Sequence, residues 1–181
     1  MTKPFISHIA GVFDAISEWL GRTVAWLILA MAIATGAVVV VRYVLGSGSI
    51  ALQESITYLH ATVFMLGICY ALKHDQHVRV DVFYQGFSAT TRAWVNAIGN
   101  IVFVLPLCVF IIFISLNYVG NSWAIKEGSP DPGGIHGVYL LKTLIPILGI
   151  TLLMQAVSLV LQNCAALMAF YGDDQWLLNL L

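Results

Sequence analysis

Charged residues are scarce in this chain, which has eight Lys and Arg and nine Asp and Glu residues among 181. No charge occurs in the 33 residues between Arg92 and Lys126, or in the 30 residues between Lys142 and Asp173. A water-soluble protein of this length normally has charges over its whole surface. An apolar run longer than about 18 residues is instead sufficient to cross the hydrocarbon core of a bilayer as a helix. The shortage of charge therefore excludes an ordinary soluble domain.

Other shortages exclude further classes of protein. The net charge of −1 leaves no basic surface for nucleic acid. Cys69, Cys108 and Cys164 lie inside apolar runs without a CxxC pair, and we expect them to be small packing residues. His60 is the only titratable residue well inside an apolar run, where we expect it to hydrogen-bond to a neighbouring helix. We therefore expect no catalytic, cofactor or metal site in this chain.

Four uncharged runs organise the sequence. Two shorter runs, 23–41 and 55–72, precede the two long ones, and none alternates apolar with polar residues as the strands of a membrane barrel do. A helix satisfies all its backbone hydrogen bonds within itself, as lipid requires. We predict an all-α integral membrane protein that forms a single membrane domain over residues 1–181. Its transmembrane helices are expected at about 23–43, 53–72, 93–120 and 138–168.

Two further helices are expected at the membrane surface. Residues 5–20 place apolar side chains at helical spacing, which predicts an amphipathic N-terminal helix in the interface. Between spans two and three, a polar joint is followed by Val, Phe and Tyr residues, which predicts a short interfacial helix over 78–88. The candidate interfacial anchors are Lys73, His77, Arg79, Phe83 and Tyr84.

The third run is too long for a straight crossing. At 1.5 Å per residue its uncharged stretch would reach about 50 Å, against a hydrocarbon core of about 30 Å. It must tilt, bend at Pro106, or project into water near residues 117–123.

Neutral polar residues do occur in the spans. Gln155, Ser158 and Gln162 fall at i, i+3 and i+7, and therefore on one face of the fourth helix. Such side chains seek hydrogen-bonding partners on other helices. Two alternatives stay open: the three residues hold the bundle together, or they contact a larger membrane subunit. We take them as candidate partner contacts.

The distribution of Lys and Arg predicts the orientation. Five of them lie on the side of the termini and three on the side of the loops 46–52 and 123–137, which favours cytoplasmic termini. Arg42 and Glu54 flank the first outward loop, where they either pair with each other or contact a partner. The outward candidate contacts are Arg42, Glu54, Lys126 and Glu127.

Two separated segments resemble one family. The first is the stretch 70–84, YALKHDQHVRVDVFY, and the second lies between residues 122 and 146. The matching residues of the second are Ser122-Trp123, Lys126-Glu127-Gly128-Ser129-Pro130, Pro132-Gly133-Gly134, Leu141-Lys142 and Ile145-Pro146, and Arg42-Tyr43 and Gln53-Glu54 with Tyr58 also agree. Over about residues 20–165, the chain resembles the small, DctQ-like membrane subunit of tripartite ATP-independent periplasmic (TRAP) transporters.

The resemblance implies a function and partners. A small subunit of this kind is non-catalytic and assembles with a large permease in the bacterial inner membrane. The large subunit has the sodium and substrate sites, so no cofactor is expected in this chain. A periplasmic binding protein delivers the solute, typically an organic acid. The small subunit would brace the large one within the membrane lipids and help dock the binding protein.

Two other functions were weighed from the residues alone. A stand-alone homo-oligomeric channel or carrier needs polar residues along a pore, and only the face with Gln155 offers them. A membrane anchor of a redox enzyme would hold haem, for which a second histidine within the spans is missing.

Overall fold

The computed structural model describes residues 2–74 and 86–178, and helices account for nearly all of this part of the chain. The elements are α1 (Thr2–Tyr43), α2 (Ile50–Lys73), α4 (Ala89–Gly99), the π-helix η1 (Asn100–Val104), α5 (Leu105–Ala124) and α6 (Val138–Leu178). Four helical stretches in it are long and apolar enough to cross a membrane: His8–Tyr43, Ile50–Lys73, Ala89–Ala124 and Val138–Phe170. The predicted all-α fold with four spans is confirmed.

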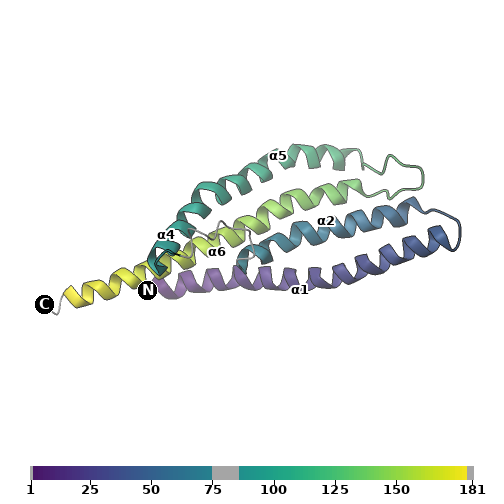
Figure 1. Ribbon diagram of the computed structural model, residues 1–181. Coiled ribbons are helices and arrows are strands. Elements are labelled where there is room, and N and C mark those ends of the chain that lie inside the picture. Colours follow the sequence, from purple (N-terminus) through teal and green to yellow (C-terminus); the bar gives the residue numbers. More distant parts are fainter. Residues whose placement is uncertain (1, 75–85, 179–181) are drawn as a thin grey trace.

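The four spans run side by side, and α6 is the central one (Figure 1). It packs against α1, α2, α4, η1 and α5, and the other large helix–helix contact is between α1 and α2. Both termini lie at one end of the bundle, here called the terminal end. The connections 44–49 and 125–137 lie at the opposite end, here called the loop end. The bundle therefore depends on what α6 presents to its neighbours.

The first helix differs from the expectation of two separate helices. Residues 5–20 are helical, but α1 continues from Thr2 to Tyr43 without a break. The polar side of its N-terminal part faces the bundle, where Ser17 is buried, and Val12 and Trp19 are exposed. An aqueous surface would have favoured the reverse arrangement. No proline interrupts the sequence between the two predicted helices, so the backbone hydrogen-bond ladder is continuous.

The third span bends as the position of Pro106 predicts. The π-helix η1 lies directly before this proline, and the backbone N–H of Leu105 bonds to the carbonyl of Asn100, five residues earlier. Proline has no N–H to continue an α-helical ladder, and π-turns are a common form of such an interruption. The span follows an arc over α6 (Figure 1).

The interfacial helix expected over 78–88 falls largely outside the described residues, as do His77, Arg79, Phe83 and Tyr84. What is described at its end is a helix cap. The Ser88 hydroxyl accepts the backbone N–H of Thr91 at 3.2 Å and thereby begins α4.

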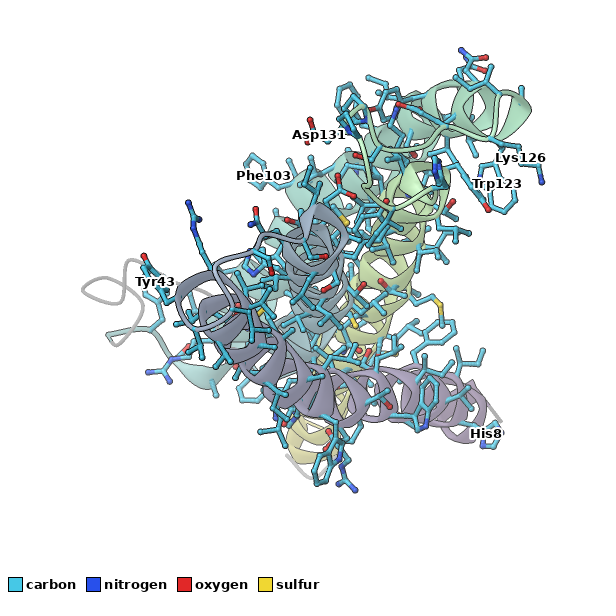
Figure 2. All side chains as sticks on the ribbon, turned by 90° about the vertical axis from the view of Figure 1, so that its right-hand side faces the viewer. His8, Tyr43, Phe103, Trp123, Lys126 and Asp131 are labelled. Atoms are coloured by element: carbon cyan, nitrogen blue, oxygen red, sulfur yellow. The ribbon has the colours of Figure 1, made fainter. Side chains whose placement is uncertain are left out.

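Large apolar side chains lie mostly on the outside. Tyr43 and Phe103 are 80% and 72% exposed, and both point away from the helices in Figure 2. The most deeply buried residues are small or polar, such as Cys69, Cys108 and Ala156. This distribution is the opposite of a water-soluble core and is typical of a bundle in lipid, where small residues let helices approach closely.

A glycine determines how closely α1 and α2 pack. A Cβ atom on Gly21 would overlap the ring of Tyr70 on α2, whereas one on Gly36 would meet nothing within 4 Å. The absence of a side chain at position 21 therefore brings the two backbones together.

We predict opposite effects for Gly21→Ala and Gly36→Ala. Alanine gains about 0.5–1 kcal/mol over glycine within a helix. At position 21 an overpacking cost of about 1–3 kcal/mol outweighs this gain, so the melting temperature should fall by a few degrees. Thermal unfolding in mild detergent measures both variants, and Gly36→Ala should be unchanged or more stable. Equal shifts for the two variants would contradict the proposed packing.

Candidate functional site

One carboxylate joins the first and last helices. Asp14 on α1 accepts hydrogen bonds from Gln155 Nε2 at 3.0 Å, from the Ser158 hydroxyl at 2.7 Å and from Gln162 Nε2 at 2.8 Å. These three donors are the polar face of the fourth span. They reach Asp14 together because the spacing i, i+3, i+7 places them in one row along α6. Asp14 and these three residues are called the Asp14 cluster below.

The Asp14 cluster is internal to the chain. Gln155 and Ser158 are completely buried, and the Gln155 carbonyl oxygen also accepts the Ser17 hydroxyl at 2.5 Å. The Ser158 hydroxyl also lies 3.2 Å from the backbone carbonyl of Ala10. Gln155 and Ser158 therefore have no surface to offer a partner, and their selection as partner contacts was wrong. Gln162 is exposed, but its amide is directed to Asp14.

A second polar group lies beside this cluster at the terminal end. Glu18 on α1 is 2.8 Å from Lys73 Nζ, 3.1 Å from His74 Nε2 and 3.1 Å from Arg22 Nε. Lys73 also donates to the backbone carbonyl of Asp14 at 3.1 Å. The structure thus places Lys73 against α1, where it ties the end of α2 to that helix. Its expected position as an outward anchor is replaced by a contact between helices.

At the loop end, Glu54 fixes the long connection. Its carboxylate accepts the Ser129 hydroxyl and, at 2.6 Å, the backbone N–H of Ile135. Among the described residues no ion pair joins Glu54 to Arg42, so the pair considered from the sequence does not form. Glu54 is used to hold the loop 125–137, because an unpaired carboxylate attracts N–H and O–H donors strongly.

Glu127 is also engaged within the chain. Its carboxylate lies 2.5 Å from Lys142 Nζ, and the Lys142 ammonium stands 4.1 Å from the centre of the Tyr118 ring. The Lys142 ammonium holds the pKa of Glu127 below its ordinary value of 4.5. Arg42 and Lys126 remain exposed at this end, with Lys126 Nζ 5.9 Å from the Tyr139 ring. Of the four outward candidates, these two are the ones open to a partner.

A polar row on α2 escaped the analysis of the sequence. Gln53, Thr57 and His60 are all exposed, and their spacing i, i+4, i+7 places them on one face. We call this the α2 face. His60 was expected to bond to a neighbouring helix, but it lies on the outside of the bundle. The same spacing rule that identified the row on the fourth span would have found this one.

We predict that Asp14→Leu destabilises the bundle by about 2–4 kcal/mol, because buried amide and hydroxyl donors lose their acceptor. Chemical or thermal unfolding in detergent measures the loss. Asp131→Leu is the matched control, since the Asp131 side chain is exposed in the loop and lies outside this cluster. Equal stability of the two variants would show that the cluster does not hold α1 to α6.

Comparisons with known proteins agree with this architecture. A family model described as "Tripartite ATP-independent periplasmic transporters, DctQ component" matches residues 31–166, which include most of α1 and the whole of α2, α4 and α5. No curated protein and no solved structure matches the chain. Among the described residues, no group of three His, Cys, Asp or Glu side chains could hold a metal ion. The chain therefore belongs to the DctQ family, the small membrane component of the TRAP transporters.

Proposed function

We propose that this chain braces the large permease subunit of a sodium-driven transporter for organic acids, and that the α2 face is where the large subunit binds. The observation that supports this most is the exposure of His60. It lies ten residues after the start of α2, or about 15 Å along a helix of about 36 Å. This position is near the middle of the bilayer.

Lipid tails are a poor neighbour for the α2 face. They provide no hydrogen-bonding partner for an imidazole or a hydroxyl, and polar groups exposed there raise the free energy of the isolated chain. A protein surface with complementary donors and acceptors removes this cost. The expected occupant is the large permease, because membership of the DctQ family implies such a partner.

A pore through this chain has less support. The channel or carrier alternative needed the row of Gln155, Ser158 and Gln162 to line a path. Gln155 and Ser158 are completely buried, and all three are occupied by bonds to Asp14. The sodium and solute sites are therefore assigned to the large subunit.

Orientation and docking belong to the same proposal. The excess of Lys and Arg at the terminal end favours cytoplasmic termini in a bacterial inner membrane, with the loop end in the periplasm. Arg42 and Lys126 are exposed at the loop end and provide positive charge there. They are the proposed contacts for the periplasmic binding protein, which would be steered to them by negative charge of its own.

Co-purification with the large permease tests the α2 face. We predict that the double variant Thr57→Val and His60→Leu binds the large subunit about tenfold more weakly, because about 1–2 kcal/mol of hydrogen bonding between helices is lost. The measurement is the dissociation constant of the two subunits in lipid nanodiscs.

Thr35→Val is the matched control, since Thr35 is exposed on α1 and its hydroxyl already bonds to the carbonyl of Met31 at 2.8 Å. Its affinity for the large subunit should equal that of the wild type. Failure of the wild-type chain to bind the large permease would reject the proposed function. Unchanged affinity of the double variant would reject the α2 face alone.

A further inference from the structure

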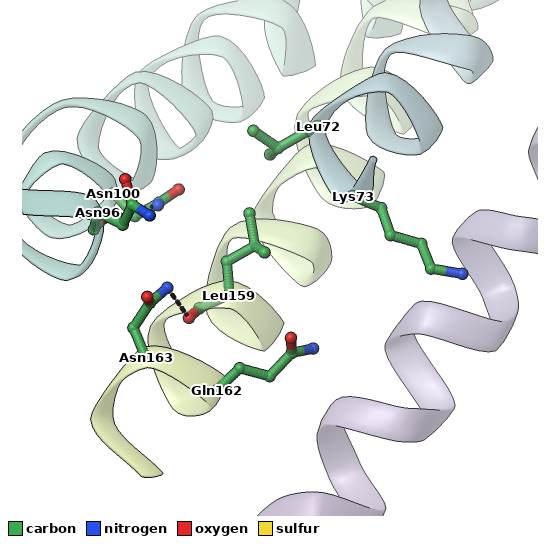
Figure 3. A pocket seen from close by; sticks show the side chains of 7 residues that line it. All are labelled: Leu72, Lys73, Asn96, Asn100, Leu159, Gln162 and Asn163. Carbon is green, nitrogen blue, oxygen red and sulfur yellow. Dashed lines mark hydrogen bonds between the residues drawn. The ribbon is translucent and has the colours of Figure 1, made fainter. Parts of the chain in front are cut away.

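A cavity of about 270 Å³ opens near the terminal end, between α2, α4, η1 and α6. Amide side chains from three of its sides surround it, and Leu72 and Leu159 form an apolar wall (Figure 3). The lining residues are Leu72, Lys73, Asn96, Asn100, Leu159, Gln162 and Asn163. Most cavities of a membrane bundle are lined by apolar residues, so a set of amides here needs an explanation.

The amide nitrogens around this cavity are already used. Asn100 Nδ2 donates to the carbonyl of Asn96 at 2.8 Å, and Asn163 Nδ2 donates to the carbonyl of Leu159 at 2.7 Å. Gln162 Nε2 donates to the Asp14 carboxylate at 2.8 Å. Each of these partners is an acceptor only, so the orientation of each amide is determined and its oxygen is left for another donor.

One of these oxygens is buried and has no donor. Asn100 Oδ1 is inaccessible to solvent and makes no hydrogen bond. An unsatisfied buried acceptor costs about 1–3 kcal/mol, and native structures nearly always pair such atoms. The oxygen of Asn163 is free to accept from the opposite side of the same space (Figure 3). The cavity is therefore built from acceptors and lacks a donor.

The cation nearest to the cavity does not supply that donor. The Lys73 side chain is directed away from the amides and toward α1 (Figure 3). Its ammonium bonds to the Glu18 carboxylate at 2.8 Å and to the Asp14 carbonyl at 3.1 Å. The missing donor must therefore come from a molecule other than this lysine.

The depth of the cavity indicates which molecule. Asn96 is seven residues from the start of α4, or about 10 Å along the helix. Lys73 is the last residue of α2. This depth is that of the polar headgroups and the first carbons of one leaflet, which extend about 5–8 Å on each side of the hydrocarbon core.

We propose that this cavity binds the primary ammonium headgroup of a phosphatidylethanolamine-type lipid. The ammonium has three N–H donors for the oxygens of Asn100 and Asn163, and its positive charge suits an acceptor-only site beside the Asp14 cluster. Its acyl chains would extend along the apolar wall formed by Leu72 and Leu159. A phosphatidylcholine headgroup has no N–H donor, and an anionic headgroup would face carbonyl oxygens. The lipid would thus fill the angle between α2 and the bent third span.

Native mass spectrometry of the full chain in mild detergent tests this site. The chain is equilibrated with equal amounts of phosphatidylethanolamine and phosphatidylcholine that have identical acyl chains. We expect about tenfold more bound phosphatidylethanolamine. We also expect Asn100→Leu to reduce this ratio to about one. Asn117→Leu, the same change at an exposed position of α5, should keep the wild-type ratio.

Several outcomes would overturn the assignment. Equal retention of the two lipids by the wild type would show that the cavity does not select a primary ammonium. An unchanged ratio in Asn100→Leu would place the selective site elsewhere. Glycerophosphoethanolamine, which has the same headgroup without acyl chains, should not compete at equal concentration, and competition would point to a soluble ligand. If Asn100→Leu loses its helical circular dichroism, Asn163→Leu provides the same comparison.

Discussion

The bundle depends on the hydrogen bonds that Asp14 accepts from α6. Apolar burial provides little drive for association between helices in lipid, because lipid tails are as apolar as leucine. Close packing and polar contacts must supply it. The Asp14 cluster does both, since Ala10 and Ala156 are buried beside the bonded Gln155 and Ser158 and let the helices approach. The long α1 helix is thereby fixed across α6, and Lys73 then ties α2 to the same part of α1.

The polar groups of the chain divide into those that are satisfied internally and those that are left over. The Asp14 cluster, the contacts of Glu18 and the loop contacts of Glu54 and Glu127 are satisfied within the chain. What remains is the α2 face, the two exposed cations of the loop end, and the acceptor-lined cavity. A protein that braces another needs such unsatisfied surfaces, because a partner or a lipid can bind only where hydrogen-bonding capacity is unused.

Much of this could be predicted from the sequence, because lipid imposes strong rules on composition. Runs without charge gave the four spans, and Pro106 gave the bend in the third. The partners of individual polar residues could not be predicted, because periodicity identifies a face of a helix but not what it meets. Asp14 was assigned to a water-facing side of an amphipathic helix, although its partners lie 141 to 148 residues away. Glu54 likewise binds a backbone amide 81 residues further on.

The central claim is that polar residues on α6 serve this chain and those on α2 serve its partner. Photo-crosslinking in the assembled transporter tests it most directly. A photoreactive amino acid is placed at position 60, at position 162 on the α6 row, or at position 113 on the exposed apolar side of α5. The account predicts a crosslink to the large permease from position 60 only. Crosslinks to the large permease from position 162 or 113, with none from position 60, would contradict it.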